Sequence, residues 1–524
     1  MAKTYGSSLA IHESEDKKMT EAPSGPILDG KKVGLVPVLF QSVTTVAPAA
    51  GVATALPLSA GYAGGALPLA VLLAAAACSL IAITISQLAR HLPSAGGLST
   101  YVARGLGTVP GYVVGWALIF AYSCIPIYFW GYIGVTSIAE LQDAVPGAPH
   151  WLWVVFAIAG AVIVWALLGR GIGVSTRTGV VMGLIELTVF TALAVILIVK
   201  AGSGNTLDVF TPHSGNSEGF GAVLPAAIYA ILAFVGFEAA APIGEESDNP
   251  RRNVPVAMLV SVSIGTFIYL LCSYASVVFV GPDKMKNFPA LGGGLPWTYL
   301  SERVWVPLGV VIFFVLLNSL IGNANGGSNA ATRMSFSLGR AGGLPSVFAR
   351  VHEPSGTPIV AIRTLMAGSI ALALVLGLWL GGGPLEVFAI FGTTLTVLVL
   401  VSYLLVAASC TAFYLRERRD EFRLVVHGVV PVLAFVLLVP VLIASLGIKF
   451  AGLDIAPVTG PAAWGLWLAV VWLVIGLGIA LFLKARRPET MHRVSEVFVS
   501  GELESGPEAR PVHATRPAPL EGSV

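Results

Sequence analysis

Long apolar runs alternate with short polar loops along most of this chain. Between residues 33 and 484, apolar side chains dominate twelve stretches, and a run of roughly 18 or more such residues is long enough to cross the hydrocarbon core as a helix. The pattern therefore predicts an all-α polytopic membrane protein with twelve transmembrane helices. The spans are expected at residues 33–58, 66–88, 109–138, 150–169, 178–199, 221–243, 255–281, 304–324, 358–380, 384–413, 425–447 and 462–484.

Composition supports this class and excludes others. The 524 residues are 56% hydrophobic and 11% charged, whereas a soluble protein carries roughly 25% charged residues. The four cysteines lie far apart in apolar runs, which predicts buried side chains rather than a disulfide framework or a metal site. Nucleotide-loop, zinc-ligand and nucleophile-elbow spacings do not occur. We therefore expect a protein that is not an enzyme, with no cofactor, no metal and no nucleic-acid partner.

The two ends differ from the span-containing region. Residues 1–32 and 485–524 are polar and are predicted to be disordered tails on either side of a twelve-helix domain at 33–484. The first segment has no apolar core, so the first span is expected to act as the targeting signal. Counted with the adjoining span ends that hold Arg363 and Lys484, the tails and even-numbered loops hold 25 of the 30 Lys and Arg residues. The positive-inside rule then places both termini in the cytoplasm, with the cell membrane as the expected location.

Two spans are interrupted by residues that break helices. The first is broken over Ala47–Gly51, which includes Pro48, and the sixth between Gly236 and Pro242, where Glu238 also lies. Broken segments five spans apart predict inverted repeats, here about 33–199 and 221–413, followed by helices eleven and twelve at 425–484. The alternative is that Pro and Gly only kink ordinary helices. An acid at the second break favours a polar binding site instead.

Three motifs resemble those of the amino acid–polyamine–organocation (APC) transporter superfamily, and they occur along the chain in the family's order. They are F-V-G-F-E (234–238) with E-E-S-D-N-P-R-R-N-V-P (245–255), L-P-S-A-G-G-L-S-T-Y (92–101), and G-R-A-G-G-L-P (339–345) with its flanking Asn325, Arg333 and His352. The resemblance covers residues 33 to about 420. The chain departs from the family at the first break, which is A-P-A-A-G (47–51) rather than a Gly-Ser-Gly-Ile type run. It also has Ala341 within the usual Arg-Asp-Gly triplet.

The resemblance implies a zwitterionic substrate held by backbone groups at the two breaks. It places the carboxylate at the first break, where the contacts are Ala49, Ala50 and Gly51, with hydroxyls from Thr44 and Thr45 nearby. It places the ammonium at carbonyls of Ala233, Phe234 and Gly236. Phe234 and Phe237 could cover the substrate as a gate, although packing explains Phe237 equally well. In span three, some of Tyr122 and Tyr128–Tyr132 could line a pocket, but an aromatic belt at the outer interface also explains Tyr128–Tyr132.

Ion coupling requires an intramembrane group that changes its charge. Glu186 and Glu238 are the proton-coupling candidates, whereas Glu386 is expected to reach water near a span end. A sodium site built from carbonyls and Asn318, Ser319, Asn323 and Asn325 stays open. The resulting hypothesis is a secondary active transporter of amino acids or related amines, working by alternating access and favouring proton symport. Alternatives are an exchanger, a polyamine or cation carrier of the same fold, and a non-transporting membrane receptor.

Overall fold

The computed structural model describes residues 32–94, 96–169, 172–352, 356–379, 384–446, 448, 458–491 and 494. The two predicted tails lie almost entirely outside these residues. Within them the chain is helical, and the β-structure consists of two isolated bridges, Val33 with Ser247 and His352 with Thr357. The predicted all-α polytopic class is therefore confirmed.

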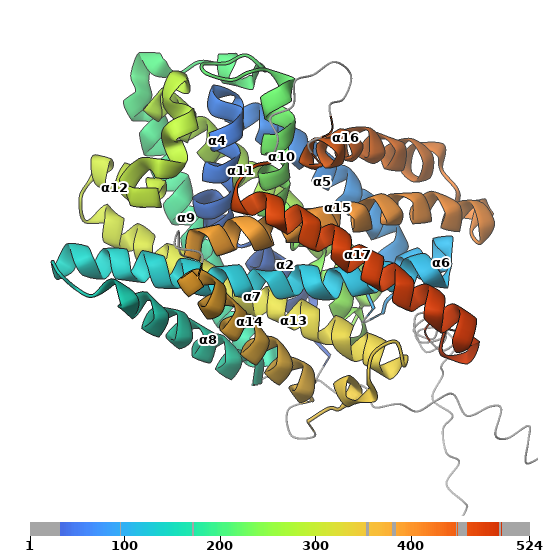
Figure 1. The fold of residues 1–524 in the computed structure, drawn as a ribbon. Helices are drawn as coiled ribbons and strands as arrows, with labels where there is room; N and C mark the ends of the chain where they lie inside the picture. The colour runs from blue at the N-terminus through green and yellow to red at the C-terminus, as the bar shows by residue number, and fades with distance from the viewer. Residues whose placement is uncertain are drawn as a thin grey trace, which may run out of the picture.

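Most helices follow the apolar runs, but the helix Leu308–Arg340 continues well past residue 324, where the eighth span is predicted to end. The α-helices of eight or more residues are α2 (Leu35–Val46), α4 (Leu56–Ala63), α5 (Leu67–Ala89), α6 (Leu98–Leu106), α7 (Thr108–Ala144), α8 (Trp153–Gly169), α9 (Ile172–Ala201), α10 (Phe220–Phe234), α11 (Pro250–Val280), α12 (Pro296–Val304), α13 (Leu308–Arg340), α14 (Ile359–Trp379), α15 (Pro384–Arg416), α16 (Val430–Ser445) and α17 (Pro461–Arg486). Figure 1 shows the long helices α7 and α15 running side by side and α17 crossing them obliquely, and all three pack on one another.

The described residues contain ten segments long and apolar enough to cross a membrane, or up to eleven if the bent pair around Gly236 is one span. The first of these segments, Leu35–Ala89, has 55 residues. A continuous helix of that length would measure about 80 Å, against roughly 30 Å of hydrocarbon. The chain turns at Gly64, where φ is 56° and ψ is −134°. The count of twelve depends on dividing the segment there, and it stays a prediction, as does the inverted repeat.

The first span breaks at Ala47, between α2 and the short helix α3 (Pro48–Ala50). Pro48 is the cause, because a proline disfavours the α conformation in the residue before it and has no N–H to donate. Ala47 takes φ 44° and ψ 76°, the one positive φ outside glycine in the described chain. Such a conformation costs about 1–3 kcal/mol and persists only when its surroundings hold it. A π-helical turn, η1 (Gly51–Ala55), follows before α4 begins.

The sixth span breaks where α10 ends at Phe234. Val235 is extended and Gly236 has φ 118°, a conformation that favours glycine. The 3₁₀ helix η6 (Phe237–Glu246) then continues the chain at a bend of 44°. Both interruptions therefore occur at the residues where the sequence predicts them.

The two breaks lie against each other inside the bundle. A Cβ on Gly236 would come within 2.6 Å of the carbonyl carbon of Thr45, so only glycine permits this approach. Ser42 joins the same two segments: its Oγ donates to the Phe237 carbonyl at 2.8 Å and accepts the Ala240 N–H at 3.1 Å. Helices α5, α9, α11 and α13 pack around this junction.

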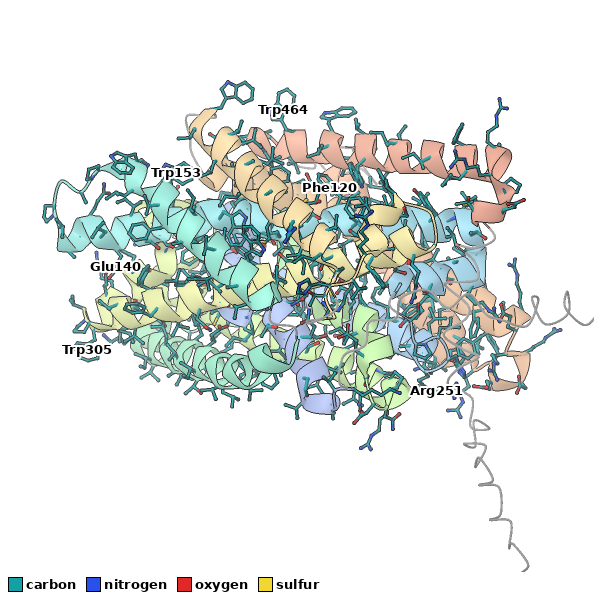
Figure 2. The ribbon with its side chains drawn as sticks, turned by 90° about the horizontal axis from the view of Figure 1, so that it is seen from below. Phe120, Glu140, Trp153, Arg251, Trp305 and Trp464 are labelled. Atoms are coloured by element: carbon teal, nitrogen blue, oxygen red, sulfur yellow. The ribbon has the colours of Figure 1, made fainter. Side chains whose placement is uncertain are left out.

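Loops expected on opposite sides of the membrane lie at opposite ends of the bundle. Figure 2 places Glu140 and Trp305 toward one end, and Arg251 toward the other. The belt interpretation of span three is wrong: Tyr128, Phe129, Trp130 and Tyr132 are at most 4% exposed. They pack between helices instead, and the Trp130 indole N–H donates to Ser369 Oγ on α14 at 3.0 Å.

Candidate functional site

Glu238 lies at the second break with its carboxylate fully enclosed. Its Oε1 accepts a hydrogen bond from the Tyr122 hydroxyl at 2.9 Å. Its Oε2 accepts from the Tyr403 hydroxyl at 2.8 Å and from the Gly236 N–H at 3.1 Å. Because Tyr122 is on α7 and Tyr403 on α15, this one acid joins the break to two long helices of the bundle. The carboxylate has donors on both oxygens, which offsets its removal from water.

Glu186 lies beside the first break, buried between α9 and α13. Asn318 Nδ2 donates to one of its oxygens, and the Ser319 hydroxyl donates to the other at 2.8 Å. Ser319 Oγ in turn accepts the Ala50 N–H at 3.0 Å. A change in the charge of Glu186 would therefore act on the backbone of the first break through Ser319.

Tyr269 on α11 connects the two breaks through its hydroxyl group. The hydroxyl lies 2.8 Å from the Ala233 carbonyl oxygen at the second break and 3.1 Å from the Val46 carbonyl oxygen at the first. A Cβ on Gly51 would come within 2.6 Å of the same hydroxyl. The side chain is fully buried, and its ring packs edge-to-face on Phe234 with centroids 5.0 Å apart. Three of the residues at the predicted substrate site thus touch one phenol.

Two of the three backbone donors predicted for a substrate carboxylate are engaged within the chain in this structure. The Ala50 N–H donates to Ser319 Oγ at 3.0 Å, and the Gly51 N–H donates to the Ala47 carbonyl at 2.9 Å. The hydroxyls of Thr44 and Thr45 donate to carbonyls of their own helix. The structure therefore brings the predicted residues together, but most of their polar groups are hydrogen-bonded to other groups of the chain.

The two phenylalanines predicted as a gate are both fully buried. Phe234 faces Tyr269, and Phe237 packs against Tyr403 with centroids 5.7 Å apart. The Phe234 ring therefore packs on the tyrosine that contacts both breaks. The Phe237 ring packs on Tyr403, whose hydroxyl donates to Glu238.

Several residues of the site were not singled out from the sequence. Tyr269, Tyr403 and Ser42 lie in apolar runs, where a single tyrosine or serine is common and carries no spacing signal. An indirect signal exists for Tyr403 and Tyr122, because a buried acid such as Glu238 requires donors from neighbouring helices. The identity of those donors depends on helix packing, which sequence periodicity alone does not give.

The four side chains considered for the alternative sodium site differ in their hydrogen bonding. Asn318 and Ser319 are bonded to Glu186. Asn323 and Asn325 are at most 8% exposed, and the Oδ1 atom of each lacks a hydrogen-bond partner within the described part of the chain. These two carbonyl oxygens keep the sodium alternative open. Glu386, the third acid weighed, is only half-buried at the start of α15.

An ion pair joins η6 to the far end of α13. Arg333 Nε lies 2.7 Å from Glu246 Oε1, and both side chains are at most 10% exposed. Val33 pairs with the same segment, since its N–H donates to the Glu246 carbonyl and its carbonyl accepts the Asp248 N–H. This cluster closes the bundle at the end predicted to face the cytoplasm.

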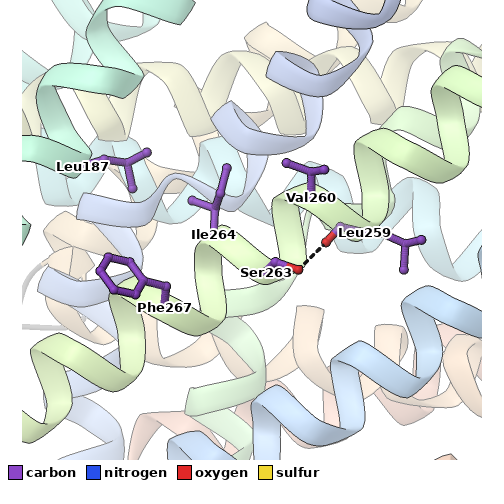
Figure 3. A pocket seen from close by; sticks show the side chains of 6 residues that line it. All are labelled: Leu187, Leu259, Val260, Ser263, Ile264 and Phe267. Carbon is purple, nitrogen blue, oxygen red and sulfur yellow. Dashed lines mark hydrogen bonds between the residues drawn. The ribbon is translucent and has the colours of Figure 1, made fainter.

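A groove of about 460 Å³ lies between α9 and α11, away from these polar groups. Figure 3 shows its lining, which is apolar except for Ser263, and the Ser263 hydroxyl donates to the Leu259 carbonyl of its own helix. Phe267 and Val260 at its rim are exposed, as expected of a lipid-facing surface. This groove lacks polar groups that could orient a zwitterion.

A polytopic helical bundle in which two discontinuous helices meet at a buried polar centre is the architecture of membrane transporters. Comparison with known families agrees: residues 33–479 match the model of the amino acid permease family. The chain belongs to this family, and the resemblance seen in the motifs is confirmed.

Individual relatives are similar over most of the chain. The branched-chain amino acid permease BcaP of Bacillus subtilis is 28% identical over 57% of this chain and 65% of its own length. The gamma-aminobutyric acid permease of Escherichia coli is 28% identical over 69% of this chain and 76% of its own. The methylthioribose transporter of Bacillus subtilis is 26% identical over 83% of this chain and 89% of its own. The protein is therefore a transporter, and its substrate needs a separate argument.

Proposed function

We propose that this protein is a secondary active transporter that carries an amino acid across the cell membrane by alternating access around the two breaks. The observation that carries this proposal is the meeting of unwound backbone from both broken helices at Tyr269, flanked by Glu186 and Glu238. Unwound carbonyls there suit an ammonium, and helix N-termini suit a carboxylate. Two of the relatives are named for amino acids, which supports this substrate class.

The enclosed acids favour a substrate with one ammonium group over a polyamine. A second cationic group would need a carboxylate to pair with, because an unpaired buried charge costs several kcal/mol. Glu238 and Glu186 both already accept hydrogen bonds on each oxygen from neighbouring side chains. A polyamine would have to displace these donors, whereas a neutral zwitterion would not.

We assign the coupling role to a proton at Glu186, with Glu238 holding the second break in place. Glu186 accepts a hydrogen bond from the Ser319 hydroxyl, which in turn accepts the Ala50 N–H, so the charge state of Glu186 is transmitted to the first break. Asn318 and Ser319 can each accept as well as donate, which lets the site hold either form of the acid. We also propose that both termini lie in the cytoplasm, and protease digestion of terminal tags in spheroplasts and in inverted vesicles tests this orientation.

Uptake into proteoliposomes tests the function. A panel of amino acids and polyamines should show accumulation of an amino acid class that increases with an inward proton gradient. Glu186→Gln should abolish the gradient-driven part while retaining counterflow between substrate on the two sides. Counterflow in the wild-type protein that ignores the gradient would identify an exchanger, and uptake of polyamines alone would replace the amino acid assignment.

A further inference from the structure

The Tyr269 side chain contacts both breaks at the position expected for the substrate. Its hydroxyl lies within 3.1 Å of the Val46 and Ala233 carbonyl oxygens, and it lies against Gly51. These are unwound carbonyls of the kind to which the proposed function assigns the substrate ammonium. A phenol and an ammonium group cannot occupy this space together.

We propose that the Tyr269 hydroxyl fills the ammonium subsite of the empty transporter, and that a substrate must displace it in order to bind. This inference rests on the proposed function and adds a built-in competitor to it. The hydroxyl supplies a donor to buried carbonyls that would otherwise lack one, which is costly in a dry interior. It therefore stabilises the closed form and weakens substrate binding by the same interaction.

The chemistry of this exchange selects for ligands with several N–H donors. A phenol has one proton to share between the two carbonyls, whereas a primary ammonium has three. When an amino acid displaces the hydroxyl, its ammonium can therefore donate to both carbonyls and still has one N–H free. A ligand whose nitrogen carries a single N–H restores no more than the phenol already provides. Tyr269 thus acts as a specificity-determining residue that favours primary amines over N,N-dialkylated ones.

Binding to the purified, full-length protein in detergent tests the proposal. Tyr269→Phe keeps the ring against Phe234 and removes only the hydroxyl. The dissociation constant of the transported amino acid, measured by calorimetry, should fall by about twofold to tenfold in this variant, which corresponds to one hydrogen bond. Tyr274→Phe is the matched control, because Tyr274 lies on the same helix and its hydroxyl donates to the exposed Asn205. That control should bind as the wild-type protein does.

An unchanged or raised dissociation constant in Tyr269→Phe would overturn the proposal, since the hydroxyl would then be neutral or part of the substrate's own binding site. A second measurement uses the wild-type protein alone. The N-methyl derivative of the transported amino acid retains two N–H groups and the N,N-dimethyl derivative one, so affinity should fall more at the second methylation than at the first. An equal loss of affinity at the two methylations would contradict the proposal that the Tyr269 hydroxyl competes with the substrate ammonium. Absence of binding by any amino acid to the wild-type protein would instead refute the proposed function.

Discussion

Glu238 shows how one residue can organise the centre of a membrane protein. An acid inside a span is costly unless its oxygens are paired, and the pairs available here come from α7, α15 and the backbone of the break itself. The same contacts that satisfy the carboxylate therefore hold three segments of the chain together. Glu186 does the equivalent at the first break through Asn318 and Ser319.

Removing one of these donors should destabilise the fold measurably. Tyr403→Phe deletes the 2.8 Å hydrogen bond to Glu238 while keeping the ring against Phe237. The free energy of unfolding should fall by about 1–3 kcal/mol, because a buried carboxylate loses a donor. Thermal unfolding in detergent measures the change, with Tyr274→Phe as the control that should differ from wild type by less than about 0.5 kcal/mol. Equal effects for the two variants would show that the Tyr403 hydroxyl does not support Glu238.

At the scale of the elements, the two broken helices differ in how they are interrupted. Pro48 forces Ala47 out of the helix, so the first break is fixed by local sequence. At the second break, Gly236 combines a left-handed conformation with direct backbone contact to Thr45. The close backbone approach of the broken helices at Thr45 therefore requires glycine at position 236.

Comparing Gly236→Ala with Gly281→Ala separates the cost of a side chain at positive φ from the cost of the contact with Thr45. Both glycines have positive φ, 118° and 98°, but a Cβ at Gly281 meets nothing within 4 Å. Gly281→Ala should lose about 1–3 kcal/mol of stability from backbone strain alone, because its φ of 98° and ψ of 130° lie in a region that side chains rarely adopt. Gly236→Ala should lose a further 1–3 kcal/mol or so from the clash with Thr45, and should abolish uptake. Retained transport by Gly236→Ala would mean that close contact of the breaks is dispensable.

At the scale of the whole molecule, the sequence predicts the parts that depend on local pattern. Apolar runs predict the helices, and Pro48 and Gly236 predict the breaks, because those residues act on their own backbone. The closed state of the site is not predictable in this way. It depends on Tyr269 and Tyr403, which reach the breaks from helices far along the chain. The burial of Tyr128 and Trp130 is missed for the same reason, since an apolar run does not reveal which of its faces meets protein.

In the proposed mechanism, the movement of an amino acid through this bundle is coupled to a proton at Glu186. The most direct test loads proteoliposomes with a pH-sensitive dye and adds the transported amino acid outside. Wild-type protein should acidify the lumen only when the amino acid is added, and Glu186→Gln should not acidify it while still exchanging substrate. Substrate uptake without acidification by the wild-type protein would contradict proton coupling. Acidification that persists in the Glu186→Gln variant would contradict the role of Glu186 in it.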